Sequence, residues 1–556
     1  GAGCEAPSHE ETPMSIDLEA DRFGSAGFAD YAMRKRAGLY RRQGAYIGHD
    51  AAGRACYAGG QSAILLCGGA RSLKGSVVMP WLVDAYLRDG DRLPHIIALD
   101  LKRQDTVVSS LQVRQGRHCF YYNPRQAAGM PSHRMNPCEH FTPGSPTLVP
   151  NALFFGQNWI PNTDPRAAYF EGMAQKIVAA SIVTETRETG FVTLPTLADR
   201  MAGLGGLSEA WLSFEHAISR QPEPQINEVA GMLQELRAKD SDSGGWAGIK
   251  NEIARSFSPI MDTQIRAALS PPFDLSFQRL TEPDCPPCMV SIMEDLEFAE
   301  TTAPVIRAIF TAALIAKRRA PMTARPQFWC LNEIAHFPWP MAESLATISA
   351  GFGIRTAYVV QSTRQLDNLK KGASTVIPQS CGVQIYLGTR SVEQASLISR
   401  QLGRTTLRYD DTAAQERARA AGSKAMLDAM MGGDPFAAAL EVAHQDRLAQ
   451  HKSKMARDLR SPDEVLNTDM GQAYVFMPGV LEKPFLARIP PYWQRRDLAG
   501  AYLGDPFHSK PGTVEIATRW GQRHRTVITE AAPRHLRDWP QYRESGLWSY
   551  VKGHRP

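Results

Sequence analysis

The sequence predicts an α/β fold in which helices cover both faces of a parallel sheet and an all-α block interrupts the sheet domain. Apolar runs of strand length alternate with helix-forming stretches from about residue 63, as they do in parallel sheets. Residues 169–188 instead carry apolar side chains at spacings of three and four, and helical patterns continue to about residue 268. Strand patterns then return at residues 289–292, 328–331, 357–360, 383–387 and 473–477.

Composition narrows the class of protein. The 556 residues are 43% apolar, enough for several cores, and the formal net charge of +5 is too small to indicate a nucleic-acid binder by bulk charge. Nine cysteines at irregular spacings indicate reduced thiols in a cytosolic setting. A membrane span needs about 20 apolar residues, and the longest apolar runs are far shorter, so we expect no transmembrane segment in this chain.

Residues 64–76 have the form of a phosphate-binding loop that has lost a glycine. The motif is G-x-x-x-x-G-K-S/T. Gly68 and Lys74 fit it, whereas Leu73 stands at the second glycine and Gly75 at the hydroxyl position. In an intact loop, glycine lets backbone N–H groups approach phosphates closely. A glycine-rich turn without a ligand is the alternative. The residues predicted to bind a nucleotide here are Gly68, Gly69, Ser72, Lys74, Gly75 and Ser76.

A second candidate is the apolar run 328–331, which ends in Asn332 and Glu333. Strands of this kind commonly end in two carboxylates, of which one supports magnesium and the other polarises the attacking water. Asn332 brings no charge to a cation, so we expect weak magnesium binding, while Glu333 remains a candidate base. Gln361 ends another predicted strand, where it can contact a γ-phosphate or orient water. The alternative for all three is a polar strand end that makes turn hydrogen bonds.

Two further pairs have ordinary explanations. Asp100 and Lys102 follow a strand end, where open α/β sheets place ligand groups, but a surface ion pair is the alternative. Cys285 and Cys288 form a C-x-x-C, yet no second pair and no histidine follows at the spacing of a zinc motif. We therefore favour two free thiols and predict no metal ligand.

The tail from residue 497 interleaves arginines with tryptophans and tyrosines, and it carries nine Lys and Arg against six Asp and Glu. Three interpretations stay open. The tail is a strap that packs its tryptophans over the sheet domain, a docking arm for a protein, or a track for single-stranded nucleic acid. Its small surplus of positive charge favours protein over nucleic acid as a partner.

Several segments resemble the coupling proteins of type IV secretion systems, the TraG/TraD group of RecA-like hexameric ATPases. The resemblance extends over about residues 60–495, and the segments follow the order of the family. They read CGGARSLKGSVVMPW, ALDLK, MNPCEHF, FWCLNEIAHF, GFGIRTAYVVQSTRQL, QSCGVQIYLGTRSVEQASLISRQLGRTT and RDLRSPDEVLNTDMGQAYVFMPG.

The resemblance implies a RecA-like P-loop domain with an inserted all-α domain, and ATP and Mg²⁺ as ligands. It places Lys74, Glu333 and Gln361 at functional positions, the last two as catalytic residues. Leu73 and Asn332 depart from the family pattern, so we expect weak nucleotide binding and weak or absent ATP hydrolysis. The expected parts are a lead segment (1–60), the nucleotide-binding domain (61–150 and 281–496, with a helical insertion at about 409–457), the inserted all-α domain (151–280) and the C-terminal tail (497–556).

The resemblance also implies partners and a place in the cell. Members of the family pass a relaxase–DNA complex or effector proteins to the secretion channel at the cytoplasmic face of the bacterial inner membrane, with adaptor proteins in some systems. We therefore expect a hexamer-forming component that recruits substrate. An active ATPase motor of conjugative DNA or effector transfer is one alternative, and a DNA-binding mobilisation accessory protein is the other.

Overall fold

The computed structural model describes residues 23–84, 86–88, 92–163, 165–238, 245–409, 411–432, 434–450 and 453–556. The start of the predicted lead segment, residues 1–22, lies outside these residues. The chain forms two compact units. The larger contains Asp30–Gly388 and Asp469–Pro556, and the smaller contains Thr389–Thr468 with the described end of the segment Gly1–Ala29.

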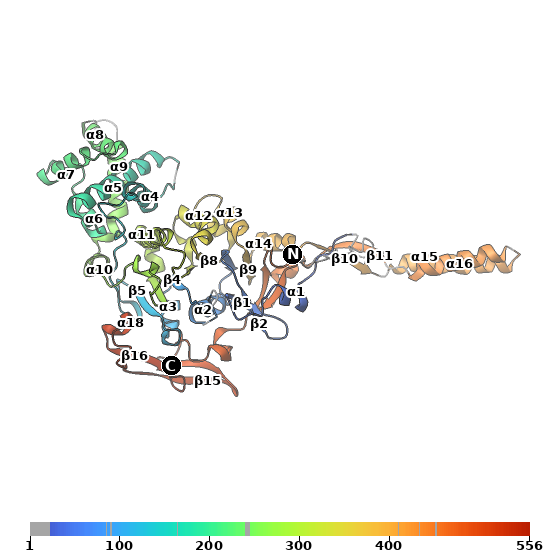
Figure 1. The fold of residues 1–556 in the computed structure, drawn as a ribbon. Helices are drawn as coiled ribbons and strands as arrows, with labels where there is room; N and C mark the ends of the chain where they lie inside the picture. The colour runs from blue at the N-terminus through green and yellow to red at the C-terminus, as the bar shows by residue number, and fades with distance from the viewer. Residues whose placement is uncertain are drawn as a thin grey trace, which may run out of the picture. The chain divides into compact units, whose positions relative to one another are not determined.

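Among the described residues, an 11-stranded sheet forms the centre of the larger unit (Figure 1). Its parallel strands lie in the order β9-β3-β8-β7-β4-β6-β5. They are β3 (Ile64–Gly68), β4 (His95–Asp100), β5 (His118–Tyr122), β6 (Cys288–Met293), β7 (Gln327–Asn332), β8 (Ile354–Val360) and β9 (Val383–Leu387). Strands buried on both faces read as continuous apolar runs. The predicted α/β class with a parallel sheet is confirmed.

The sheet continues beyond β9 with antiparallel strands in the order β12, β13, β1, β2. Their bounds are β12 (Gln472–Phe476), β13 (Phe485–Arg488), β1 (Ala45–His49) and β2 (Ala55–Ala58). The prediction that residues 1–60 are only a lead segment is therefore wrong for β1 and β2, and α1 (Tyr31–Arg36) precedes them. Two features make these strands hard to predict from the sequence. Strand β2 has only four residues, and β1 has a register shift at Gly48, whose φ is +123°.

The sheet unit also contains α2 (Gly75–Val83), α3 (Gln104–Val108), α11 (Ala299–Arg318), α12 (Pro340–Ile348) and α13 (Ala373–Ser380). Among the described helices, the stretch Leu296–Arg318 is as long and apolar as a membrane span. However, 83% of its most apolar window is buried inside the protein, as in a core helix. The Arg307 guanidinium of α11 donates to the carbonyls of Asn158 and Trp159, which ties this helix to the end of α4 (Leu148–Trp159).

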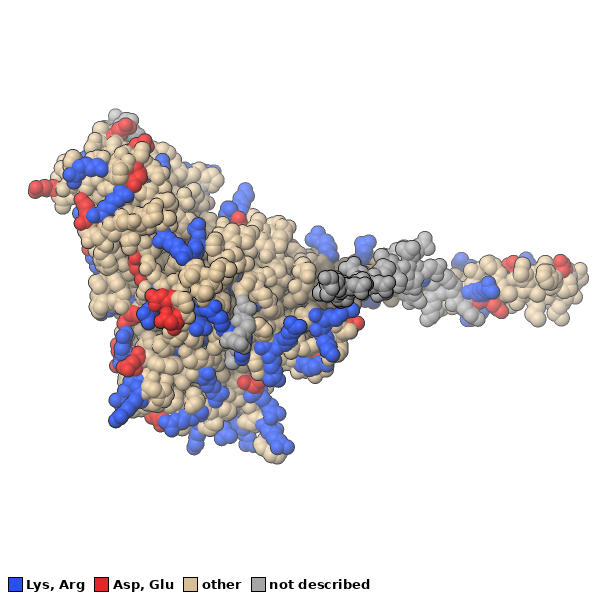
Figure 2. Space-filling model, viewed as in Figure 1, with Lys and Arg blue, Asp and Glu red and all other residues tan. Residues whose placement is uncertain are grey.

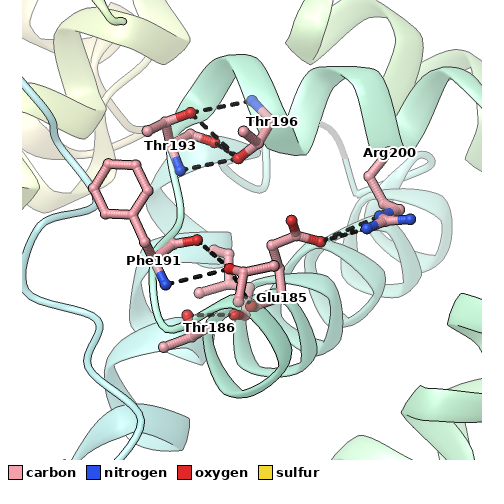
Figure 3. Close-up of polar contacts among 8 residues, drawn as sticks. Glu185, Thr186, Phe191, Thr193, Thr196 and Arg200 are labelled. Atoms are coloured by element: carbon pink, nitrogen blue, oxygen red, sulfur yellow. Dashed lines mark hydrogen bonds and ion pairs between the residues drawn. The ribbon is translucent and has the colours of Figure 1, made fainter. Parts of the chain in front are cut away.

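The helical block follows β5 and has no strand in its described residues between 148 and 268. After α4 it contains α5 (Ala168–Thr189), α6 (Leu194–Ala202), α7 (Glu209–Ser219), α8 (Pro224–Ala238), α9 (Gly245–Phe257) and α10 (Thr263–Ala268). Figure 3 shows the junction of α5 and α6, where Thr193 and Thr196 exchange the hydrogen bonds of a capping box. Arg200, near the end of α6, also donates to Glu185 of α5 at 2.9 Å and links the two helices.

The smaller unit contains a helical hairpin on a strand pair. Strands β10 (Arg404–Tyr409) and β11 (Ser453–Asp458) pair antiparallel, and α15 (Thr412–Met430) and α16 (Pro435–Gln450) lie side by side between them in the chain. Helices α14 (Val392–Leu402) and α17 (Pro462–Leu466) complete this unit. Both helices of the hairpin fall in the stretch 409–457, for which the sequence predicts a helical insertion.

The tail forms a three-stranded antiparallel sheet of β14 (Thr513–Thr518), β15 (Gly521–Ala531) and β16 (Leu547–Val551), with α18 (Pro540–Arg543). Trp548 and Tyr542 belong to its buried core, and Gln541 bonds to backbone groups of Arg117 and Cys119 at β5. This is the arrangement of a strap. The first half of β15 is exposed, and Lys and Arg gather over this lower part of the molecule (Figures 1 and 2).

Candidate functional site

The predicted site residues meet at one edge of the parallel sheet. Gly68, Asn332 and Gln361 stand at or directly after the carboxyl ends of β3, β7 and β8, which are neighbours in the order β3-β8-β7. Parallel strands bring their carboxyl ends to the same edge, and ligands of open α/β sheets bind there. A pocket of about 550 Å³ opens at this edge.

The loop between β3 and α2, where the sequence predicts phosphate binding, turns through two left-handed residues. Arg71 and Leu73 both adopt the left-handed region, with φ of 59° and 66°. This region is strained for residues other than glycine, by roughly 1–3 kcal/mol each. The first glycine is needed for close approach, because a Cβ at Gly68 would lie 2.6 Å from Ser72 Oγ. Helix α2 begins at Gly75, with Lys74 as its N-cap.

Glu333 lies at the centre of a charged cluster and is almost fully buried. Its Oε1 lies 2.7 Å from Lys102 Nζ and 3.5 Å from Lys74 Nζ. Its Oε2 accepts from Gln361 Nε2 at 3.3 Å and lies 3.5 Å from His336 Nε2. Burial would raise the pKa of this carboxyl, but the hydrogen bond from His336 and the charges of both lysines outweigh it. The pKa of Glu333 is therefore held well below its ordinary value.

The same cluster affects the pKa of Lys74. Burial lowers the pKa of Lys74, and the attraction of Glu333 opposes that shift. The Lys74 amine is directed to the Glu333 carboxylate. The cluster therefore joins the predicted phosphate-binding residue to the candidate base through a single ion pair.

Asn332 has a carboxylate partner on a different element. Its Nδ2 donates to Asp105 Oδ2 at 2.7 Å, from the first turn of α3. Burial, and then the charge of Asp100, raise the pKa of Asp105 to about 7. Burial likewise raises the pKa of Asp100, whose carboxylate accepts from the backbone N–H groups of Lys102 and Thr106. The carboxylate that Asn332 lacks thus lies directly beside it.

The tail supplies one side of the pocket, which the sequence did not reveal. The pocket is lined by parts of residues 71–79, 102–108, 332–333, 492–493 and 502–515. The N–H of Leu503 donates to the carbonyl of Val108 at 2.8 Å, and Gln104 donates to Asp505. Long-range contacts of this kind leave no local pattern, so only the three-dimensional structure places the tail beside the phosphate loop.

Most of the predicted nucleotide-binding residues line the pocket. Ser72, Lys74, Gly75, Ser76, Asn332 and Glu333 lie in its wall, whereas Gly68, Gly69 and Gln361 do not. Gln361 contacts the site through its hydrogen bond to Glu333. The hydroxyl of Ser76 accepts from the N–H of Tyr492 at 3.2 Å. Sequence reasoning missed Asp105 as a site residue, since it follows the end of β4 by five positions.

The residues present fit a nucleotide phosphate better than they fit its metal. Ser72 Oγ is buried and has no hydrogen-bond partner among the described residues, and the space where Gly75 would carry a Cβ is open. Both features suit an anion held by the loop and the start of α2. For Mg²⁺, the donor set has an amide at Asn332 and a carboxylate at Asp105, and no hydroxyl at position 75.

Comparisons with known proteins identify the family and the fold. Residues 22–426 match the family model described as "Type IV secretory system Conjugative DNA transfer", well over half of the chain. Comparison with curated protein sequences finds no match.

Solved structures show the same fold. One is the unbound bacterial conjugative coupling protein TrwBdeltaN70, with 13% identity, coverage of 85% of this chain and 96% of that chain, and a TM-score of 0.56. The plasmid coupling protein TrwB in complex with the GTP analogue GDPNP has 13% identity, coverage of 87% and 99%, and a TM-score of 0.56. TrwB in complex with ADP and Mg²⁺ has 13% identity, coverage of 84% and 96%, and a TM-score of 0.52. The likeness extends over nearly the whole of each solved chain, and it shows a RecA-like α/β architecture.

Proposed function

This chain belongs to the conjugative DNA transfer family of type IV secretory systems, as a coupling protein, and from that premise we propose that it recruits a transfer substrate to the secretion channel. The substrate is an effector protein or a relaxase–DNA complex, delivered with or without an adaptor at the cytoplasmic face of the bacterial inner membrane. The proposal includes a nucleotide site that binds ATP weakly and turns it over slowly or not at all. Assembly as a homo-oligomer, a hexamer in the family, is part of it.

The observation that carries the proposal is the confinement of Glu333. A general base works best with a pKa near the working pH. The carboxylate of Glu333 instead faces Lys74, Lys102 and His336, which stabilise its charged form and leave it a weak acceptor for the proton of water. Slow hydrolysis follows from this arrangement more directly than from the loss of any one motif residue.

Nucleotide binding itself is supported by the loop. The backbone of residues 71–75, Ser72 Oγ and Lys74 would hold the phosphates, and Asp105 with Asn332 would face the metal. Bound Mg²⁺ would neutralise charge on the phosphates. The titles of the TrwB structures name ADP with Mg²⁺ and non-hydrolysable analogues of GTP and ATP as ligands of that protein. The retained loop backbone also favours the rival function, an active motor.

Substrate recruitment is assigned to the helical block, because its helices form a group beside the sheet with both Lys/Arg and Asp/Glu on their surface (Figures 1 and 2). Helix α4 is excluded from this role, since its carbonyls at Asn158 and Trp159 bond to Arg307 of α11. The docking surface of the block is therefore expected to begin after α4.

A deletion tests this assignment. Residues 163–252 are replaced by a Gly/Ser linker that leaves α4 and α10 in place, and capture of substrate or adaptor is measured by pull-down with purified partners. We expect capture to be lost while the thermal unfolding of the remaining sheet unit stays cooperative. The matched control removes residues 412–450, the helical hairpin of the smaller unit, and should keep capture. Capture that survives the first deletion would refute the role of the block.

A further inference from the structure

A second cluster of reactive side chains lies at the opposite edge of the sheet, where the strands begin. His95 is the first residue of β4, Cys288 is the first residue of β6, and Cys285 lies in the turn before it. Their ligand atoms all lie within 4.8 Å of one another, and all three side chains are buried. The nucleotide pocket lies at the carboxyl ends of the strands, so this cluster has no part in it.

The two sulfur atoms have the separation of ligands that share one ion. Cys285 Sγ and Cys288 Sγ lie 4.0 Å apart. Two thiolates about 2.3 Å from one tetrahedral zinc ion lie about 3.8 Å from each other. The two sulfur atoms of the C-x-x-C turn therefore already lie at the distance that one metal ion requires, without a rearrangement of the backbone.

The histidine is held against the turn. His95 Nδ1 accepts from the N–H of Cys288 at 3.0 Å. Nε2 therefore carries the ring proton, and Nδ1 is the nitrogen whose lone pair a metal ion can take. No sequence motif connects this histidine with the cysteines, because it lies 190 positions before Cys285.

One arginine links the two segments that carry the ligands. Arg325 donates to the carbonyl of Leu93 at 2.9 Å and to that of Cys285 at 3.1 Å. Leu93 lies two residues before His95, so these bonds fix the histidine and the C-x-x-C turn relative to each other.

We propose that His95, Cys285 and Cys288 bind one thiophilic divalent metal ion of the Zn²⁺ class. Binding forms two sulfur–metal bonds, and the two thiol protons are released. It also forms one nitrogen–metal bond through the lone pair of His95 Nδ1, which then no longer accepts from the N–H of Cys288. Three protein ligands leave one position of a tetrahedral ion for a further ligand. The site is structural, because it fastens the return of the chain from the helical block to the starts of β4 and β6.

Cobalt titration of the full-length, reduced, metal-free chain tests the proposal. We expect one Co²⁺ per chain, with the visible bands of a tetrahedral ion and a thiolate charge-transfer band, both removed by added Zn²⁺. Zn²⁺ should also raise the midpoint of thermal unfolding. Cys285→Ser and Cys288→Ser should each weaken binding at least tenfold, whereas Cys381→Ser, another buried thiol, should bind as the wild type does.

Three results would overturn the proposal. The first is a wild-type chain that gives no tetrahedral cobalt spectrum, and the second is a Cys285→Ser chain that binds Co²⁺ as tightly as the wild type does. The third is a folded His95→Ala chain with an unchanged spectrum, which would remove the histidine from the site. If Cys288→Ser or His95→Ala does not fold, Cys285→Ser decides, because its side chain lies in a turn outside the strands.

Discussion

At the scale of single residues, the site pairs an amide at the expected carboxylate position with a carboxylate on another element. Asn332 stands where the motif has a carboxylate, and Asp105 places a carboxylate 2.7 Å from it. The sequence revealed the loss and not the neighbour, because Asp105 lies on a short helix that carries no motif. Lys74, Glu333 and Gln361, by contrast, could be located from the sequence, since each belongs to the loop or directly follows an apolar run.

Asn332→Asp should make the stability of the protein depend on magnesium. The variant loses the hydrogen bond to Asp105 and sets two carboxylates against each other, which costs about 1–3 kcal/mol of folding free energy at pH 8. Millimolar Mg²⁺ should restore most of the lost unfolding temperature, measured by differential scanning calorimetry. Asn332→Ala is the control, since it loses the hydrogen bond without gaining charge and should not respond to Mg²⁺. Equal stability of Asn332→Asp with and without the ion would contradict this account.

Asp105 should make stability fall as the pH rises. Its pKa is raised from 3.8 to about 7 in the folded protein. Below about pH 4 the folded and the unfolded chain both hold the proton of Asp105. Between pH 4 and 7 the unfolded chain releases it and the folded chain keeps it. The free energy of unfolding therefore declines through this window. Asp105 is partly exposed to the pocket, and solvent screening limits the effect to about 1–2 kcal/mol.

Asp105→Asn should remove this part of the pH dependence while it keeps an acceptor for Asn332. Urea unfolding at pH 4.5 and pH 8 measures the difference. The variant should lose less stability than the wild type does between the two values. Parallel curves for both proteins would show that the carboxyl titrates near its ordinary pKa.

At the scale of elements, the strands buried on both faces could be predicted, and the outer antiparallel strands β1 and β2 could not. Strands β3 to β9 appear in the sequence as mainly apolar runs, whereas β1 and β2 are short and irregular. The tail escaped prediction for a related reason. One half of β15 is exposed on both faces, so it has no alternation of apolar and polar side chains. Its attachment depends on α18 and a few tertiary hydrogen bonds.

The tail should contribute to stability through its buried core and not through its exposed β14–β15 turn. Trp548→Ala should destabilise the protein by about 3–5 kcal/mol, because this side chain is only 3% exposed in the core of the tail sheet. Trp520→Ala is the matched control: its side chain is 79% exposed at the turn between β14 and β15, and its loss should leave the unfolding temperature unchanged. Equal thermal stability of the two variants would argue against the strap.

At the scale of the whole molecule, we assign different tasks to the carboxyl and the amino ends of the parallel strands. The carboxyl ends of the strands hold the phosphate loop, the charged cluster of Glu333 and the Asp105–Asn332 pair. The amino ends hold the His95, Cys285 and Cys288 cluster, to which we assign a structural metal. Family membership and the RecA-like fold could be expected from the long family segments in the sequence. The rate of nucleotide turnover could not, because it depends on which charges surround one carboxylate in three dimensions.

Steady-state ATP turnover tests the central claim most directly. The full-length chain is assayed with saturating ATP and Mg²⁺, beside Lys74→Ala and, as a control for loss of a lysine, the exposed Lys371→Ala. We predict phosphate release by the wild type that is no faster than that of Lys74→Ala, because Glu333 is held as an ion-paired carboxylate. Robust turnover by the wild type and by Lys371→Ala that disappears in Lys74→Ala would contradict the account and identify an active motor.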